Sequence, residues 1–434
     1  MTPLRGSAAK LETAAIAVVP VGSGSLDDGA LEAVLQPLLA PVAGIGGTLV
    51  GEAEVDARVP VVVLVATGGT ERTILDLVAR RRQVMDGEPV CLLAHPGNNS
   101  LAASLEVLAR LQQDGVRGRI CLVRGPGDEL GLARLASTVA DLRLWHAMRA
   151  SRIGLVGEPS DWLVASAPDD EAVRTQWGPQ VRRIPLDSVL RRLQGVPDEM
   201  AADFAATWLA RAEPGEAATM PGEVAAAGRI WAALRAIIEE DHLDAVTVRC
   251  FDLLQASGAS GCLALATLAD EGIVAGCEGD LCAALGLLLA GLRLDRVAWM
   301  ANPIDLDEDA NTLRLAHCTV PPSLTTAFRL RSHFESGRSV AVAGELLPGP
   351  VTLLRIGGMR LDQAWLAEGT ATPAPPAENS CRTRLDVTLH VGAVDDLLRH
   401  PLGNHLVVIP GAHARALEGC FALVMGARVG SWRG

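Results

Sequence analysis

Carboxylates and histidines that could do chemistry gather in the second half of the chain. Two acidic loops stand out, Glu278-Gly279-Asp280 and the 305–309 run, whose sequence is Asp-Leu-Asp-Glu-Asp. Six of the nine histidines follow residue 316, namely His317, His333, His390, His400, His405 and His413. Carboxylates transfer protons, and together with imidazoles they hold divalent cations. These residues therefore predict a site for acid–base or metal-assisted chemistry.

The acidic residues also have plain structural interpretations. Asp280 stands directly before an apolar helical run that begins at Leu281, and we favour a helix N-cap for it over a catalytic role. For the 305–309 run we favour a solvated turn. The loop Thr67-Gly68-Gly69-Thr70 can hold an anion with its backbone N–H groups, although its pattern is short and unspecific.

Three cysteines stand beside these candidate groups, at positions 277, 318 and 381. They are either small buried residues or the wall of a thiol-lined pocket that tunes or replaces a metal. The sequence leaves both interpretations open.

The elements that must position these residues differ between the first 300 residues and the remainder. Apolar runs at Ala14–Val21, 59–66, 90–94 and 120–123 predict buried strands, and helical spacing at 73–82 and 101–113 separates them. Repeated strand, loop and helix predict a parallel sheet that is covered on both faces. A second such unit begins at Ser151, with predicted strands at 245–251 and 273–276. Glu278 follows the last of these strands, at the edge where such sheets form their binding crevice.

After residue 301, short runs rich in Val, Thr and Leu predict a mostly antiparallel β domain, with the 370–377 segment as a loop on its face. The predicted fold is thus α/β. It comprises two Rossmann-like parallel-sheet domains, at 1–150 and 151–300, followed by a mostly antiparallel, barrel-like β domain at 301–434.

Composition excludes several classes of protein. The chain has 434 residues, of which 49% are hydrophobic and 21% charged, and this balance excludes global disorder. With 38 basic against 51 acidic residues, the net charge of −13 argues against nucleic acid as a partner. The nine cysteines form no CxxC pair, and the first residues lack a secretory pattern. The apolar run 281–292 is too short to cross a membrane. We therefore predict a cytoplasmic protein with no membrane partner.

A family resemblance adds to these observations. The stretch Gly261–Leu292 resembles the core motif of the L-fucose/L-arabinose isomerase superfamily, and the compact, fucose-isomerase-like branch in particular. Further similar stretches lie at 67–71, 98–100 with Glu106, 157–162, 313–321, 331–336, 348–352, 381–383 and 401–406. They cover nearly the whole chain, and the C-terminal ones are the more specific.

The resemblance implies an aldose–ketose isomerase that uses Mn²⁺ or another divalent metal and acts through an ene-diolate. Glu278 matches the first acidic ligand, which also transfers a proton, and His405 matches the C-terminal ligand histidine. His317 matches a histidine near the metal in the arabinose isomerase branch, and we count it as catalytic. The second acidic ligand falls on Asn302, which offers a neutral oxygen, so Asp305 is the candidate for the missing carboxylate.

The substrate implied by the resemblance is a sugar or sugar derivative. The positions that match its surroundings are Asn404, Cys318, Arg382, Thr67, Asn98 and Trp162. Two alternatives to the isomerase stay open at this point. One is a superfamily member with an altered metal site that performs another proton transfer next to a carbonyl. The other is a carbohydrate-binding protein without catalysis.

The superfamily also implies a homo-oligomer, and we expect a trimer or a hexamer. The loops that carry Thr67 and Asn98 would then cap the Glu278–His405 pocket of a neighbouring subunit. Trp is frequent at interface hot spots, so Trp162 is a further candidate for that contact.

Overall fold

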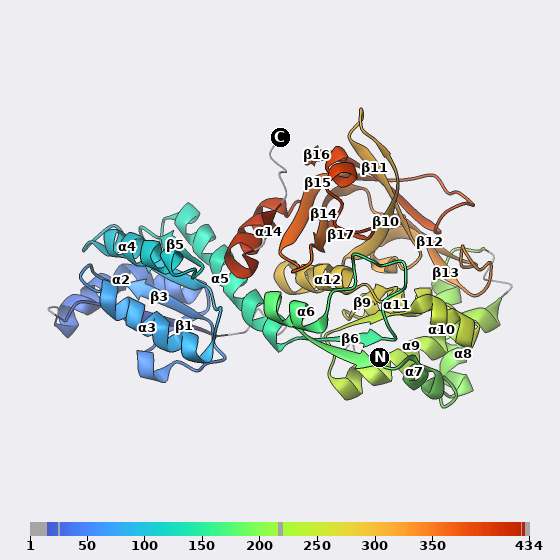
Figure 1. The fold of residues 1–434 in the computed structure, drawn as a ribbon, viewed down its shortest axis with the longest axis horizontal. Helices are drawn as coiled ribbons and strands as arrows, with labels where there is room; N and C mark the ends of the chain where they lie inside the picture. Colours follow the sequence, from blue (N-terminus) through green and yellow to red (C-terminus); the bar gives the residue numbers. More distant parts are fainter. Residues whose placement is uncertain (1–14, 25–26, 216–219, 427, 430–434) are drawn as a thin grey trace. The chain divides into compact units, whose positions relative to one another are not determined.

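A computed structural model describes residues 15–24, 27–215, 220–426 and 428–429, with the elements drawn in Figure 1. Contacts divide the chain into two compact units. The smaller unit combines residues 9–147 with 419–426, and the larger contains 148–418. The three domains predicted from the sequence, with boundaries near 150 and 300, stay a prediction.

A five-stranded parallel sheet forms the centre of the smaller unit, with strand order β2-β1-β3-β4-β5. Its strands are β1 (Ile16–Val21), β2 (Gly47–Leu49), β3 (Val61–Val65), β4 (Val90–Ala94) and β5 (Gly118–Leu122). Its helices are α2 (Asp28–Gly44), α3 (Glu71–Val84), α4 (Ser100–Gln113) and α5 (Glu129–Ala150), with a short 3-10 turn at Glu52–Glu54. Residue Ala14 of the first predicted strand lies outside the described residues.

The alternation of side chains along the strands explains why both faces of this sheet are covered. In β3, Val62 and Leu64 join a core with Leu38 of α2 and Leu135 of α5. Val61, Val63 and Val65 join a second core with residues of α3 and α4. Successive strand residues point to opposite faces, so an uninterrupted apolar strand needs a helix layer on each side. The predicted doubly covered sheet is confirmed.

The larger unit begins with a four-stranded parallel sheet of order β7-β6-β8-β9. Its strands are β6 (Arg152–Val156), β7 (Gln180–Ile184), β8 (Ala245–Val248) and β9 (Val274–Cys277). The helices of this part are α6 (Asp170–Gln176), α7 (Leu186–Leu193), α8 (Asp198–Arg211), α9 (Pro221–Asp241), α10 (Cys250–Ser257), α11 (Cys262–Asp270) and α12 (Leu281–Leu294). The strand predicted over 245–251 is too long, because Cys250 already begins α10, which buries Leu253 and Leu254.

A closed six-stranded antiparallel barrel completes the larger unit. Its order is β14-β17-β10-β11-β16-β15, and pairing of β14 with β15 closes the ring. The strands are β10 (Trp299–Asp307), β11 (Thr312–His317), β14 (Gly349–Gly357), β15 (Gln363–Pro373), β16 (Thr383–Val391) and β17 (Leu406–Pro410). Closure leaves no unpaired edge, so this domain stands as a barrel, as the sequence predicted.

Smaller elements flank the barrel. They are the hairpin of β12 (Thr325–Arg331) and β13 (Ala341–Leu346), a 3-10 turn at Pro322–Leu324, α13 (Asp395–Arg399) and β18 (Arg428–Val429). Near the end of the chain, α14 (Ala414–Cys420) is followed by a π-helix at Phe421–Met425, which belongs to the smaller unit. The loop predicted over 370–377 is wrong in its first half. Residues 370–373 continue β15 and pair with β16, and the pairing ends at Pro373, since proline cannot donate to a ladder.

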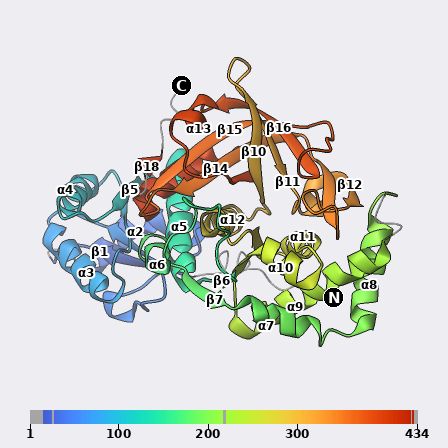
Figure 2. The same ribbon diagram turned by 45° about the vertical axis from the view of Figure 1, so that its right-hand side comes forward.

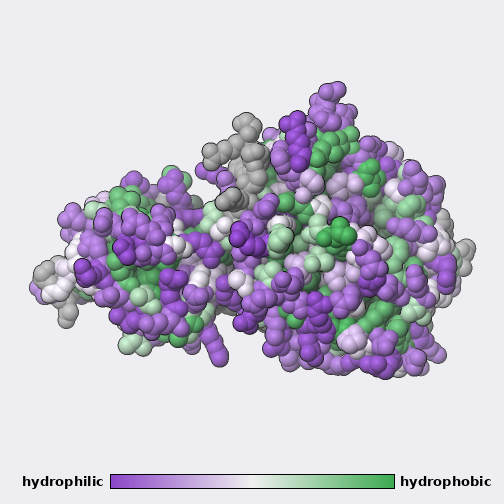
Figure 3. Space-filling model, in the orientation of Figure 1, coloured by the Kyte–Doolittle hydropathy of each residue, from purple (hydrophilic) through white to green (hydrophobic). Residues whose placement is uncertain are grey.

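Helix α12 joins the sheet and the barrel of the larger unit. It packs against β8 and β9 of the sheet and against β14 and β17 of the barrel, and Figure 2 shows it directly below β14. All but three of its fourteen residues are buried, which explains its continuous apolar sequence. Polar side chains cover most of the face visible in Figure 3, and apolar ones occur there in small groups. Among the described residues, no helix is both long and apolar enough to cross a membrane.

Candidate metal centre and active site

Glu278 occupies a strained position between β9 and α12. Its backbone is left-handed, with φ of 63°, and the next residue, Gly279, is also left-handed, with φ of 72°. A side chain on Gly279 would lie 2.8 Å from Cα of Pro159, so only glycine fits there. Non-glycine residues in this region cost about 1–3 kcal/mol and concentrate at functional sites. The tight turn directs the Glu278 carboxylate away from α12 and toward the barrel.

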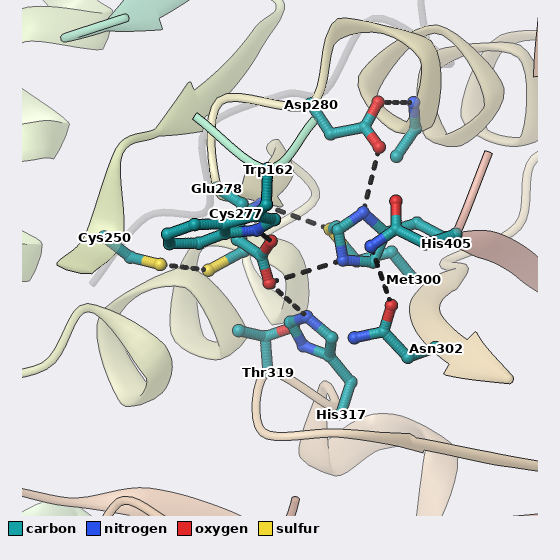
Figure 4. Close-up of polar contacts among 12 residues, drawn as sticks. Trp162, Cys250, Cys277, Glu278, Asp280, Met300, Asn302, His317, Thr319 and His405 are labelled. Atoms are coloured by element: carbon teal, nitrogen blue, oxygen red, sulfur yellow. Dashed lines mark hydrogen bonds and ion pairs between the residues drawn. The ribbon is translucent and has the colours of Figure 1, made fainter. Parts of the chain in front are cut away.

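Two histidines from the barrel meet this carboxylate (Figure 4). His317 is the last residue of β11, and His405 directly precedes β17. Oε1 of Glu278 lies 3.8 Å from Nε2 of His317 and 3.4 Å from Nε2 of His405. All three residues are buried, and their ligand atoms lie within 4.8 Å of one another. Within the described part of the chain, this is the one group of three such residues that could hold a metal ion.

Hydrogen bonds fix how the two imidazole rings face the carboxylate. Nδ1 of His405 lies 2.9 Å from Oδ2 of Asp280, and Nδ1 of His317 lies 2.9 Å from Oγ1 of Thr319. The carboxylate at Nδ1 of His405 holds a proton on that nitrogen, so Nε2 is the nitrogen that would lose its proton when a cation binds. In both rings, therefore, Nε2 is the nitrogen directed at Glu278.

Asp280 links this arrangement to the helix behind it. Its Oδ1 accepts a hydrogen bond of 2.7 Å from the N–H of Ala283, which confirms the predicted N-cap of α12. Its Oδ2 accepts from His405 and, at 3.1 Å, from Nη1 of Arg355. Arg355 is 2% exposed and also donates to the carbonyls of Leu402 and His405. One buried carboxylate thus caps a helix, orients a histidine and pairs with a guanidinium.

The charges in this cluster shift its pKa values strongly. Burial raises the pKa of Glu278, but His317 and His405 outweigh burial and hold that pKa well below its usual range. Burial lowers the pKa of His405, but the carboxylates of Asp280 and Glu278 outweigh it and raise the pKa to about 9. Burial also opposes ionisation of Asp280, yet Arg355 and His405 keep its pKa below the ordinary value. At neutral pH both carboxylates are therefore ionised.

The residues fit a divalent cation. Nε2 of His405 is fully buried and has no hydrogen-bond partner, although Glu278 lies within ion-pair distance. A buried polar atom without a partner is costly unless something else satisfies it. Two imidazole nitrogens and one carboxylate oxygen are ligands that suit Mn²⁺, Zn²⁺ or a similar ion. A cation at this point would satisfy Nε2 of His405 and balance the charge of Glu278.

The structure brings some of the other predicted site residues to this cluster. Asn302, on β10, lies beside His405 in Figure 4, and its Oδ1 accepts a hydrogen bond of 3.1 Å from Nδ2 of Asn404. Trp162 donates from Nε1 to Oε2 of Glu278 at 2.5 Å. Asp305, in contrast, is exposed on the outer half of β10, and its carboxylate accepts from the N–H of Leu306.

Of the predicted residues Cys318 and Arg382, only Cys318 lines the cavity beside the cluster. A small cavity of about 20 Å³, room for roughly one water molecule, is bordered by Glu278, His317 and five cysteines. The cysteines are Cys250, Cys262, Cys277, Cys318 and Cys381. The side chain of Arg382 points elsewhere, since its Nε donates to the carbonyl of Ser332 at 2.8 Å. The wall is thus lined by thiols, and Cys277 and Cys318 are buried, so both interpretations from the sequence fit. A role of these thiols at a metal stays a prediction.

Thr67 and Asn98 belong to the smaller unit. Oγ1 of Thr67 accepts from the N–H of Ser23, and the carbonyl of Asn98 accepts from the N–H of Gly68 at 2.7 Å. The two loops therefore meet at the carboxyl edge of the first sheet, where binding crevices form in such folds. Their part in substrate binding stays a prediction.

Sequence reasoning missed Arg355, Ser166 and the second role of Asp280. Arg355 donates to the hydroxyl of Ser166, so it ties the loop after β6 to Asp280. An arginine inside an apolar strand, Val351–Ile356, was the available signal, because a buried guanidinium requires a carboxylate partner.

Comparison with known proteins finds relatives of one kind. A sulfoquinovose isomerase from Alkalicoccus urumqiensis is 25% identical over 304 residues, which cover 66% of each chain. A sulfoquinovose isomerase from Priestia megaterium is 21% identical over 294 residues, 62% of this chain and 64% of that protein. One from a Clostridium species is 24% identical over 241 residues, 55% of this chain and 52% of that protein.

The chain thus spans about two thirds of the length of the first of these curated relatives and about half of the last. No family model matches the sequence. At this modest identity the similarities support a sugar isomerase family, which agrees in kind with the resemblance seen in the sequence.

Proposed function

We propose that the protein is an aldose–ketose isomerase, and that its substrate is sulfoquinovose or a closely related sulfonated sugar. The observation that carries the proposal is the group of Glu278, His317 and His405, with a buried Nε2 that lacks a hydrogen-bond partner. The sulfoquinovose isomerases among its relatives support the choice of substrate class.

The chain's own residues can supply the proton transfer. Isomerisation moves a proton between C2 and C1 of the open-chain sugar. Glu278 is ionised at neutral pH and is held at a fixed angle, so its carboxylate can accept that proton and return it to the neighbouring carbon. The Nε2 of His317 lies 3.8 Å from Oε1 of Glu278, so this histidine faces the proton-transferring carboxylate and is one of the groups that would hold a cation beside it. Asp280 keeps His405 in one tautomer throughout.

Glu278, His317 and His405 would hold a divalent cation, with Asn302 as a neutral neighbour. When bound, such an ion acts as a Lewis acid toward the carbonyl and hydroxyl oxygens of the sugar. Mn²⁺ is our candidate, on the resemblance and on the mixed nitrogen and oxygen ligands.

Turnover in the presence and absence of metal tests this proposal. The purified protein, depleted with a chelator and reloaded with Mn²⁺, should convert sulfoquinovose to its ketose, and ¹H NMR in D₂O should show deuterium incorporation at the proton-transfer carbon. Glucose serves as the unsulfonated control. Protein that turns over neither sugar in any metal form contradicts the proposal.

Asn302 favours a second candidate, a different proton transfer next to a carbonyl. The family motif expects a carboxylate at this position, and here the amide oxygen is already engaged by Asn404. Asn302→Asp separates the two ideas. It should tighten Mn²⁺ binding and preserve isomerase activity under the first, and abolish the native activity under the second.

We also propose that the protein acts in the cytoplasm as a homo-oligomer, a trimer or a hexamer, in which the loops of Thr67 and Asn98 complete a neighbour's pocket. The paired polar loops at the edge of the first sheet support this arrangement. Light scattering measures the mass directly. A fully active monomer at micromolar concentration would contradict a shared site.

A further inference from the structure

Residues 157–166, the first part of the segment between β6 and α6, cross the carboxyl edge of the second sheet, and we call them the strap. Its backbone is fastened to the site, since the N–H of Ser160 donates to the carbonyl of Glu278 at 2.8 Å. Its far end is fastened through Ser166, whose hydroxyl accepts from the buried Arg355. The strap is therefore held at both ends by the residues that build the candidate site.

Arg249, in the loop after β8, fixes the middle of the strap. Its guanidinium donates to the carbonyl of Pro159 at 2.6 Å and to both carboxylate oxygens of Asp161, at 3.2 and 3.1 Å. Arg249 also pairs with Asp252 on α10 at 2.7 Å. A bidentate arginine of this kind restricts its partner's geometry more than a single contact does. The backbone that leads into Trp162, the next residue of the strap, is therefore fixed in position.

Trp162 is half exposed, at 51%, yet its indole N–H does not face solvent. It donates to Oε2 of Glu278 at 2.5 Å, and the ring lies edge-on to Phe251 with centroids 5.1 Å apart. An exposed indole can satisfy its N–H with water. Directing it instead at a buried carboxylate is a specific arrangement, which packing alone does not require.

The two oxygens of Glu278 therefore have separate partners. Oε1 faces Nε2 of His317 and of His405, whereas Oε2 is taken by Trp162 (Figure 4). Rotation of the carboxylate would break the indole hydrogen bond. The bond thus fixes the orientation of the carboxylate, with one oxygen on the indole and the other toward the two imidazoles.

We propose that Trp162 is a positioning residue, which holds the Glu278 carboxylate so that Oε1 faces the position between the two histidines. The expected consequence of this positioning, tighter cation binding, rests on the proposed function. The hydrogen bond itself does not depend on that function. Hydrogen-bond partners of metal ligands typically contribute about 10–100-fold to metal affinity.

Indole NMR of the metal-free protein tests the hydrogen bond. The chain has eight tryptophans, so a ¹⁵N-tryptophan spectrum is simple, and Trp162→Phe identifies the Trp162 resonance by its disappearance. Glu278→Gln should move that resonance clearly upfield, because the charged acceptor is replaced by a neutral amide. If the resonance stays in place in Glu278→Gln, Trp162 does not hold Glu278 and the proposal is overturned.

Mn²⁺ affinity, measured from the EPR signal of the free ion, tests the consequence. Trp162→Phe keeps an aromatic ring beside Phe251 and removes the donor, and it should weaken Mn²⁺ binding about 10-fold. The matched control is Phe251→Leu, which disturbs the ring packing and keeps the N–H, and it should bind within about 2-fold of the parent.

The outcomes separate the positioning role from the proposed function. Equal weakening in both variants, or none in Trp162→Phe, overturns the positioning role. If the parent itself binds no Mn²⁺, the metal part of the proposed function fails, and the indole shift alone then decides whether Trp162 positions Glu278. Thermal melting of each variant checks that it is folded.

Discussion

In the described part of the chain, Glu88 and Asp280 are buried carboxylates that are each bound by an arginine and a histidine. In the smaller unit, Glu88 accepts from Nε of Arg81 at 2.6 Å and lies 2.7 Å from Nε2 of His146. In the larger unit, Asp280 accepts from Arg355 and His405 in the same manner. Composition alone, an acid with an arginine and a histidine, does not tell the two clusters apart.

Their surroundings differ. Both oxygens of Glu88 are engaged, and Arg81 also donates to the carbonyls of Asp56, Ala57 and Val59. The Glu88 cluster is thus closed, and it joins α3 to α5. The Asp280 cluster continues through His405 to an Nε2 without a hydrogen-bond partner and to Glu278 on a strained backbone. The unsatisfied atom and the backbone strain mark the second cluster as a site.

The largest expected effect separates the clusters by activity. Glu278→Gln should lower kcat about 10²–10⁴-fold, because the proton-transferring carboxylate is lost, and should leave the fold intact. Glu88→Gln should instead destabilise the fold and leave turnover nearly unchanged. Breaking this buried pair should lower the free energy of unfolding by about 3–5 kcal/mol, with kcat nearly unchanged in the folded fraction. Turnover and urea titrations of both variants measure this, and a Glu278→Gln enzyme with parental turnover would contradict it.

The next effect concerns the link between Asp280 and His405. Asp280→Asn keeps an N-cap for α12 and weakens the hold on the His405 tautomer, so Mn²⁺ affinity should fall about 10–100-fold. Isothermal titration calorimetry measures the affinity. Thr319→Val is a useful companion, because it removes the partner of His317 Nδ1 instead. An unchanged Mn²⁺ affinity in Asp280→Asn would show that His405 does not need the Asp280 carboxylate to orient it for cation binding.

The two clusters should also respond to pH in opposite directions in chelator-treated protein. The pKa of His405 is raised to about 9, so its contribution to stability is complete below about 6.5 and is lost as the pH rises through about 9. Burial opposes ionisation of Glu88, but His146 and Arg81 lower its pKa, so its contribution is present above about 4.5 and is lost as the pH falls further.

Thermal melting between pH 3 and 10 measures both losses of stability, the alkaline limb above pH 6.5 and the acidic limb below pH 4.5. Each should lower the free energy of unfolding by about 1–3 kcal/mol. His405→Gln should remove the alkaline limb and Glu88→Gln part of the acidic one. Mn²⁺ should abolish the alkaline limb, because the ion replaces the proton on His405. An alkaline limb that persists in His405→Gln would assign it to another group.

The smallest effect is expected at Asp305. This carboxylate is exposed on the outer half of β10, so Asp305→Asn should change turnover less than about 2-fold and stability by at most about 0.5 kcal/mol. A large loss of turnover would place Asp305 in the site after all and would require β10 to rearrange.

The local structure around the site residues could be predicted from the sequence, whereas the contacts between residues far apart in the chain could not. The Cys-Glu-Gly-Asp turn places Glu278 at a strand end and Asp280 at a helix start, and both follow from local patterns. The contact of Asp280 with His405 joins residues 125 positions apart, and only the docking of the barrel on α12 creates it. Local spacing carries no information of that kind.

The strand β10 shows a second limit. Its outer half is rich in aspartate and fits a solvated turn, yet the ladder with β11 continues through a register shift between Pro303 and Asp305. The apolar run around Arg355 likewise indicates a buried guanidinium that needs a carboxylate, but it does not identify that carboxylate as Asp280, 75 positions away.

Anomalous diffraction at the manganese edge, from crystals grown with Mn²⁺, shows where the ion binds. We expect one strong peak in each subunit, in contact with Glu278, His317 and His405, and its loss in His405→Gln. A peak at another position in the chain, or no peak in crystals of fully active protein, would contradict the assignment of this cluster as the metal centre.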